Sequence, residues 1–163
     1  MKLRASLLFL LITGCFSVVA QTQHMAHTEN NKKIQVIPFD EKSWPVITAT
    51  GPRPAAYLFT TSYCSTCPEA FSVIHAAAIK SNKKVELAAV MMDVEGDKAR
   101  RHATHFHGMS KLYAFNGYET AIRYAVDPQW QNITPYVVLI DRHGVAQRMI
   151  GPPPTESLRN WLQ

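Results

Sequence analysis

Residues 55–71 read AAYLFTTSYCSTCPEAF, and this stretch decides the fold. Its first seven residues form an apolar run with the length of a buried strand. Cys64 and Cys67 follow at once, and Pro68 comes directly after the second cysteine. Proline suits the first turn of a helix, because the N–H that it lacks would have no partner there. The stretch therefore predicts a buried strand, a Cys-x-x-Cys pair at its end, and a helix over residues 68–81.

Apolar spacing predicts further elements on both sides of this pair. Strands are expected at 34–39, 85–93, 136–141 and 145–150. Helices are expected after a cap at Asp40 or Ser43, over 97–107 and 118–126, and from a cap at Thr155 onward. Strands that alternate with helices and end in a hairpin predict an α/β fold, in which helices flank both faces of a central mixed β-sheet.

The first twenty residues have the pattern of a signal peptide. A basic start precedes an apolar run, and residues 18–20, VVA, fit a cleavage site for a signal peptidase. The run is too short for a membrane-spanning helix. We therefore expect a signal peptide at 1–20, a polar flexible leader at 21–33 and the folded domain at 34–163.

Export to the periplasm is the expectation that follows from this pattern. A rival interpretation is a lipobox, because LITGC at 11–15 would make Cys15 a lipidated cysteine. Apolar residues continue after Cys15, where a lipoprotein usually turns polar, so the soluble exported form is favoured.

Charge and cysteine content exclude several classes of function. The formal net charge of +5 includes Lys2 and Arg4, so cleavage after Ala20 leaves +3, with the remaining basic residues scattered along the chain. A chain without a basic run has no footprint for nucleic-acid binding. Cleavage also removes Cys15 and leaves one close pair of cysteines, which is too few for a disulfide scaffold.

A Cys-x-x-Cys pair at the start of a helix has a specific chemistry. Unpaired backbone N–H groups and the helix dipole favour a thiolate on Cys64, whose pKa should lie below that of a free thiol. Cys67, further into the helix, should be more buried and able to attack a mixed disulfide. A structural zinc site usually needs two such pairs, and a bridge that closes so short a loop stabilises little. The pattern therefore predicts thiol–disulfide exchange.

With these motifs the chain resembles the thioredoxin-fold superfamily, and within it the exported TlpA/ResA-like thiol–disulfide oxidoreductases, over residues 35–162. The stretches that carry the resemblance are YLFTTSYCSTC, VELAAVMMD, NITPYVVLIDRHGVAQRMIG and TESLRNWL. The long interval 93–135 resembles the extra strand and helix of the TlpA-like branch. The resemblance implies a thioredoxin-like domain with a TlpA-like central insertion.

The resemblance also assigns roles to individual residues. It implies that Cys64 attacks a substrate disulfide and that Cys67 resolves the mixed disulfide. Pro135 falls on the position of the family's cis-proline. Thr134 before it is expected to offer backbone hydrogen bonds to an extended substrate, with Tyr63 as a further substrate-binding residue.

Partners and cofactors are likewise implied by the resemblance. No cofactor is expected besides the Cys64–Cys67 disulfide. The expected substrates are protein thiols or disulfides. A membrane electron donor of the DsbD type would recharge the protein, which we expect to be a monomer and to work as a reductant.

The chain departs from the family where a buried acid would assist proton transfer. Leu58 stands where thioredoxins have that acid, and Ala70 stands where TlpA-like members often have a glutamate. Glu69 is one position early, a rotation of about 100° on a helix. It is either the candidate for proton transfer or a solvated carboxylate. Ser65 and Thr66, between the cysteines, give no indication of the redox potential.

A copper-binding or copper-delivery protein is the alternative. CSTCP resembles the copper-handling Sco proteins, and two thiolates would suit Cu(I). The cysteines are one residue closer than in Sco proteins, and the histidine that serves there as third ligand is missing. Two groups could supply other ligands: His24 with His27, and His102, His105 and His107 with Met109. For both groups, solvated histidines are the simpler interpretation.

Overall fold

The computed structural model of the protein describes residues 34–163. The predicted signal peptide, the leader, the lipobox at Cys15 and the histidines His24 and His27 lie outside the described residues. Between residues 34 and 163, no helix has both the length and the apolar composition to cross a bilayer.

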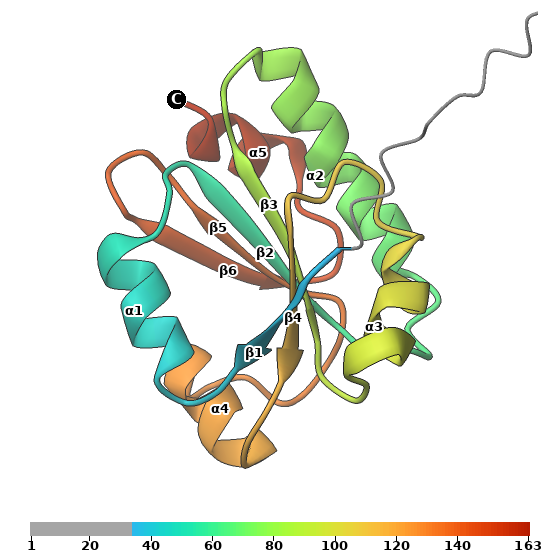
Figure 1. The fold of residues 1–163 in the computed structure, drawn as a ribbon. Helices are drawn as coiled ribbons and strands as arrows, with labels where there is room; N and C mark the ends of the chain where they lie inside the picture. The colour runs from blue at the N-terminus through green and yellow to red at the C-terminus, as the bar shows by residue number, and fades with distance from the viewer. Residues whose placement is uncertain (1–33) are drawn as a thin grey trace, which may run out of the picture. The chain divides into compact units, whose positions relative to one another are not determined.

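Strands and helices alternate along residues 34–163 (Figure 1). In chain order they are β1 (Val36–Phe39), α1 (Ser43–Thr50), β2 (Ala55–Thr60), α2 (Cys67–Ser81), β3 (Glu86–Met91), α3 (Gly96–Ala103), β4 (Lys111–Phe115), α4 (Glu119–Val126), β5 (Tyr136–Ile140), β6 (Ala146–Ile150) and α5 (Thr155–Trp161). The predicted alternation and the final hairpin of β5 and β6 are confirmed.

The strands form one mixed sheet in the order β1-β4-β3-β2-β5-β6. The first four strands in this order run parallel, whereas β5 pairs antiparallel with both β2 and β6. Every residue of β2 is buried, as its apolar run predicted. Pro38 lies in the edge strand β1, where a residue without an N–H is tolerated.

Side chains that alternate along the strands fill two separate cores, one on each face of the sheet. On β2, Leu58 belongs to the first core, which includes residues of α2, α3 and α5. Its neighbours Tyr57 and Phe59 belong to the second core, which includes residues of α1 and α4. The two groups of helices lie on opposite sides of the sheet (Figure 1). Helices on both faces of a mixed sheet were predicted, and this is confirmed.

Apolar spacing does not predict strand β4, and only the resemblance implies an extra strand within residues 93–135. It lies between β1 and β3, so it makes this sheet one strand wider on that side. The strand is only five residues long, and Lys111 at its start forms an ion pair with Glu86 of β3 at 2.9 Å. The position of β4 is therefore determined by its pairing with β1 and β3, which are distant in the sequence. Its own five residues give only a weak sequence signal for a strand.

Helix α3 ends at Ala103, earlier than the predicted position 107. Phe106 is the physical reason, because it turns into the first core and packs against Phe71 of α2, with ring centroids 5.3 Å apart. The predicted helix over 97–107 is wrong over its last four residues, and His105 and His107 lie beyond the helix end.

The predicted helix caps are also wrong. Pro154 is the N-cap of α5, and Thr155 is the first helical residue. Lys42 is the N-cap of α1, without a side-chain cap. Asp40 and Ser43 instead bond to each other: the Ser43 hydroxyl donates to Asp40 Oδ1 at 2.7 Å and accepts the Asp40 N–H at 2.9 Å. Asp40 Oδ1 also accepts the Lys42 N–H at 3.0 Å, so the Asp40 side chain, two residues before the N-cap, bonds the N–H of the N-cap itself rather than one in the first turn of the helix.

Candidate active site

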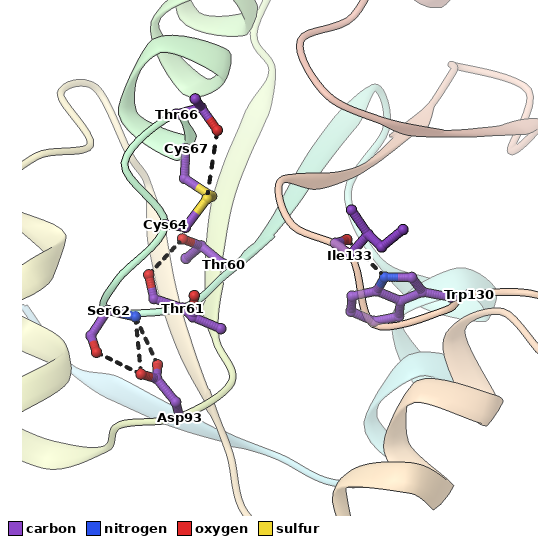
Figure 2. Close-up of a disulfide and its surroundings, with 9 residues drawn as sticks. All are labelled: Thr60, Thr61, Ser62, Cys64, Thr66, Cys67, Asp93, Trp130 and Ile133. Atoms are coloured by element: carbon purple, nitrogen blue, oxygen red, sulfur yellow. Dashed lines mark hydrogen bonds between the residues drawn. A yellow bond between two sulfur atoms is a disulfide. The ribbon is translucent and has the colours of Figure 1, made fainter.

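The Cys-x-x-Cys pair lies where the central strand β2 ends and α2 begins. Cys64 and Cys67 form a disulfide, with their Cα atoms 5.5 Å apart (Figure 2). The loop turns tightly before the helix, because the Cys64 N–H donates to the Thr61 carbonyl at 3.1 Å and the Cys67 N–H donates to the Cys64 carbonyl at 3.3 Å. Pro68 lies in the first turn of α2, as predicted. The predicted sequence of strand, cysteine pair and helix is confirmed.

The two cysteines differ in their access to solvent. Cys67 is 0% exposed, whereas Cys64 keeps 9% of its surface exposed. Cys64 precedes the N-terminus of α2, a helix of 15 residues, whose free N–H groups and positive end would stabilise a thiolate. The hydroxyl oxygen of Thr66 lies 3.9 Å from Cys64 Sγ, at the distance of a weak hydrogen bond to sulfur. Cys64 is thus the accessible sulfur and Cys67 the buried one.

A carboxylate beyond the end of β3 holds the loop in front of the cysteines. Asp93 accepts the Ser62 N–H on its two oxygens, at 2.9 and 3.1 Å, and the Ser62 hydroxyl at 2.5 Å (Figure 2). We call this set of bonds the loop clamp. Sequence analysis misses it because the two residues are 31 positions apart. The only available signal is an acid that follows the strand expected to pair with β2.

The segment before β5 leaves the sheet at the same end as the cysteine loop. The antiparallel register pairs Phe59 of β2 with Tyr136 of β5. The chain after Phe59 leads to Cys64, and the chain before Tyr136 contains Thr134 and Pro135. The Thr134–Pro135 peptide bond is cis. Pro135 is buried and Thr134 is half-buried.

The other predicted site residues divide between surface and core. Tyr63, next to Cys64, is 79% exposed. Glu69 is exposed in the first turn of α2. Leu58 and Ala70, the positions at which the resemblance would place an acid, are fully buried in the first core.

Residues 34–163 place no carboxylate in the buried surroundings of Cys67. Apart from tyrosine and tryptophan, the only buried polar residues in this part of the chain are Thr60 and Thr61. The Thr60 hydroxyl donates to the Thr61 carbonyl at 3.2 Å, and the Thr61 hydroxyl has no partner within the described residues. The described residues therefore offer Cys67 no buried carboxylate as a proton acceptor.

The histidines after β3 gather only in part. The rings of His102 and His105 are 5.4 Å apart, and His102 Nε2 is buried without a hydrogen-bond partner among the described residues. Burial lowers the pKa of His102, as does nearby His105, whereas Asp93 acts in the opposite direction. Within residues 34–163, no three side chains of His, Cys, Asp or Glu form a group that could hold a metal ion. The copper alternative therefore finds no third ligand of these types beside the cysteine pair in this part of the chain.

Comparisons with known proteins find similar solved structures but no match among sequences. No protein-family model and no curated protein sequence matches the chain. Among solved structures, the chain is similar to a secreted Mycobacterium tuberculosis disulfide oxidoreductase homologous to Escherichia coli DsbE, with 16% identity, a TM-score of 0.47, and 68% of this chain and 80% of that one covered. The chain is also similar to StoA from Bacillus subtilis, with 15% identity, a TM-score of 0.46, and 68% of this chain and 83% of that one covered. A third similar structure is a thio-disulfide isomerase from Thermus thermophilus, with 20% identity, a TM-score of 0.47, and 71% of this chain and 80% of that one covered.

The fold of residues 34–163 is thioredoxin-like, with a mixed sheet, helices on both faces and a Cys-x-x-Cys disulfide between β2 and α2. These solved structures are 15–20% identical to the chain and their TM-scores lie below 0.5, so the description of the fold rests on the chain's own topology. The assignment of residues 93–135 to a TlpA-like insertion stays a prediction.

Proposed function

We propose that this protein is a thiol–disulfide oxidoreductase, which exchanges disulfides with protein thiols through Cys64 and Cys67. One observation carries the proposal: the pair forms a disulfide at the start of α2, in which Cys64 is 9% exposed and Cys67 is fully buried. A pair that served only as a staple would close a very short loop, which contributes little stability. The unequal access of the two sulfurs suits a two-step exchange instead.

The proposed reaction begins with the reduced protein. The Cys64 thiolate attacks one sulfur of a substrate disulfide, so that a Cys64–substrate bond forms while the substrate S–S bond breaks. The leaving sulfur departs as a thiolate and takes up a proton. Cys67 then loses its proton, and its sulfur attacks Cys64 Sγ. This step forms the Cys64–Cys67 disulfide and releases the second substrate thiolate, so two electrons pass from the protein to the substrate.

The second step is expected to be the slower one. Burial raises the pKa of a thiol, because the charged form loses its hydration. Cys67 has no buried carboxylate near it within residues 34–163 to take its proton. Glu69, the sequence-based candidate for this role, is exposed to solvent. The proton therefore goes to the departing substrate thiolate or to water, and the mixed disulfide should persist longer at low pH.

An extended substrate segment would bind beside the disulfide. Thr134 is the proposed contact, because an extended chain can pair with its backbone as an added strand does at a sheet edge. The buried Pro135 and the exposed ring of Tyr63 would flank the segment. Support comes from the common end of β2 and β5, from which both loops emerge.

The cellular setting is part of the proposal. The pattern of residues 1–20 supports export to the periplasm, and a lipid anchor at Cys15 is the alternative. There the protein would act as a monomeric reductant, and a membrane electron donor of the DsbD type would return it to the dithiol state. The disulfide itself is the only redox group that this reaction requires.

Substitution of each cysteine tests the proposed roles. Reduced protein would be mixed with a disulfide-bonded protein such as insulin, and adducts would be identified by mass after acid quenching. Cys64→Ser should abolish exchange, whereas Cys67→Ser should accumulate a mixed disulfide through Cys64. Ser65→Ala, a neighbouring change that leaves both sulfurs in place, is the control and should keep the reaction. Full turnover by Cys64→Ser would contradict the proposal.

A further inference from the structure

We propose that Trp130 is a positioning residue, which holds the segment Ile133–Pro135 in the shape that a protein substrate binds. This inference rests on the proposed function, because it concerns the surface that would receive the substrate. Trp130 lies in the connection between α4 and β5, and it is only 5% exposed. The structure places it in the second core, beneath that connection.

The indole of Trp130 binds the backbone just before Thr134. Its Nε1–H donates to the carbonyl oxygen of Ile133 at 3.0 Å (Figure 2). A buried indole N–H needs a partner, and here it finds one in a connecting segment rather than in a strand. The bond fixes the orientation of the peptide that joins Ile133 to Thr134.

The ring of Trp130 also packs on both strands that lead to the site. It stacks on Tyr136, the first residue of β5, with centroids 4.3 Å apart and planes 16° apart. It also packs against Phe59 on β2 in a T-shaped arrangement, with ring centroids 5.1 Å apart. Trp130 therefore contacts the chain before Thr134 through its N–H and the chain after Pro135 through its ring face.

Asp127, next to the end of α4, closes this connection on itself. Its carbonyl accepts the Trp130 N–H at 3.0 Å, and its carboxylate accepts the Gln129 N–H at 2.8 Å. The other carboxylate oxygen accepts the hydroxyl of Tyr136. Burial raises the pKa of Tyr136, and the bond to Asp127 raises it further, so the hydroxyl stays protonated and remains a donor. Asp127 thus fixes both the backbone of Trp130 and the ring of Tyr136 on which the indole stacks.

Within residues 34–163, these contacts leave the backbone groups of Thr134 unpaired while the carbonyls on either side of it are hydrogen-bonded. The Ile133 carbonyl is occupied by Trp130, and the Pro135 carbonyl accepts the Gly151 N–H at 2.9 Å. Among the described residues, no backbone hydrogen bond uses the N–H or the carbonyl of Thr134. Thr134 is half-buried between two anchored neighbours, so its own groups remain for an incoming chain. Without the indole bond, the peptide before Thr134 could rotate and these groups would lose their alignment.

A comparison of two reductants separates this role from general stability. The oxidised protein would be reduced by dithiothreitol and, separately, by a short unstructured peptide with two cysteines, and the rates would be followed by alkylation and mass. Both reagents deliver two electrons and two protons, but only the peptide can pair with Thr134. Trp130→Phe should slow the peptide reaction by about fivefold, the equivalent of one ordinary hydrogen bond, and leave the dithiothreitol reaction nearly unchanged.

The matched control is Trp161→Phe. The indole of Trp161 is 1% exposed and donates to the carbonyls of Ala55 and Ile140, both at 3.0 Å. Those residues lie at the opposite end of the β2·β5 pair from Phe59 and Tyr136. The same chemical change there should lower thermal stability but alter neither rate. If Trp161→Phe changes the ratio of the two rates as Trp130→Phe does, the positioning role is refuted.

A second variant keeps the test decisive if Trp130→Phe does not fold. Replacement of Trp130 by 3-benzothienylalanine keeps the bicyclic ring and its stacking but removes the N–H, and it should show the same selective loss with the peptide. An unchanged peptide rate, or equal losses with both reductants, would overturn the inference while leaving the proposed function intact. If the unmodified protein reacts with neither reductant, the proposed function itself fails, and this inference fails with it.

Discussion

Removal of the loop clamp should weaken the fold by an amount that the structure bounds. Asp93 accepts both donors of Ser62, and a hydrogen bond to a charged group contributes about 1.5–3 kcal/mol when water is excluded. Both residues are exposed, so water competes for these hydrogen bonds, and each bond should contribute less than the lower end of that range. We expect Ser62→Ala to cost about 1 kcal/mol and Asp93→Ala about 2 kcal/mol of unfolding free energy. The corresponding losses in Tm are about 4 and 8 °C.

Urea unfolding of the oxidised protein at pH 7 would measure these losses in a double-mutant cycle. Ser62→Ala should cost about 1 kcal/mol in the natural protein and almost nothing once Asp93 is already alanine, because the hydroxyl has then lost its acceptor. Ser65→Ala, an exposed serine of the same loop, is the control and should have little effect in either background. Equal costs of Ser62→Ala in both backgrounds would refute the reasoning, since the hydroxyl would then act independently of the carboxylate.

Three further outcomes are expected. Because the loop clamp holds the chain that carries Cys64, Ser62→Ala should slow reduction by dithiothreitol and by a peptide equally, which is the opposite of the selective loss expected for Trp130→Phe. Burial alone would raise the pKa of Asp127, but the bonds from Tyr136 and the Gln129 N–H outweigh it and lower that pKa. A carboxyl with a lowered folded-state pKa stabilises the fold above its unfolded pKa of about 3.9 and loses this contribution as pH falls through the folded value. The difference in unfolding free energy between the natural protein and Tyr136→Phe should therefore be largest at neutral pH and become smaller below about pH 4. A difference that grows in acid would contradict this. Glu69→Gln should change the rate at which the mixed disulfide of Cys64 resolves by less than about twofold, because the carboxylate is exposed, and a loss of about tenfold or more would restore it as the proton carrier.

The part of the fold around the cysteine pair could be predicted because its signals are local. An apolar run, two cysteines and a proline follow one another within residues 55–68, and each acts on its immediate neighbours. The relative burial of Cys64 and Cys67 follows from the same local geometry, and the structure agrees. The alternation of strands and helices along the chain likewise predicts a sheet with helices on both faces.

What the sequence analysis misses depends on contacts between distant segments. β4 is held by its neighbours β1 and β3, and the ion pair of Lys111 with Glu86 joins residues far apart in the chain. The helix expected over 97–107 stops early because Phe106 finds a place against Phe71. No local pattern reports such a contact, and the same is true of the loop clamp.

Trp130 illustrates an intermediate case. Its position shortly before Thr134 and Pro135 suggests that it lies near the site, and this proximity is visible in the sequence. Whether the ring lines the surface or supports the segment from below is decided by its stacking on Tyr136 and its bond to Ile133. Those contacts require the return of β5 alongside β2, which only the folded chain provides.

The reduction potential of the Cys64–Cys67 pair tests the central claim most directly. The purified protein would be equilibrated in buffers of dithiothreitol or glutathione at a series of ratios, and its free thiols would be trapped by alkylation and counted by mass. A reductant should give a value near that of thioredoxin, about −270 mV. A value near about −120 mV would contradict the reductant role and indicate a protein that makes disulfides. A pair that does not open and close within the range of these buffers would contradict the claim that it exchanges disulfides at all.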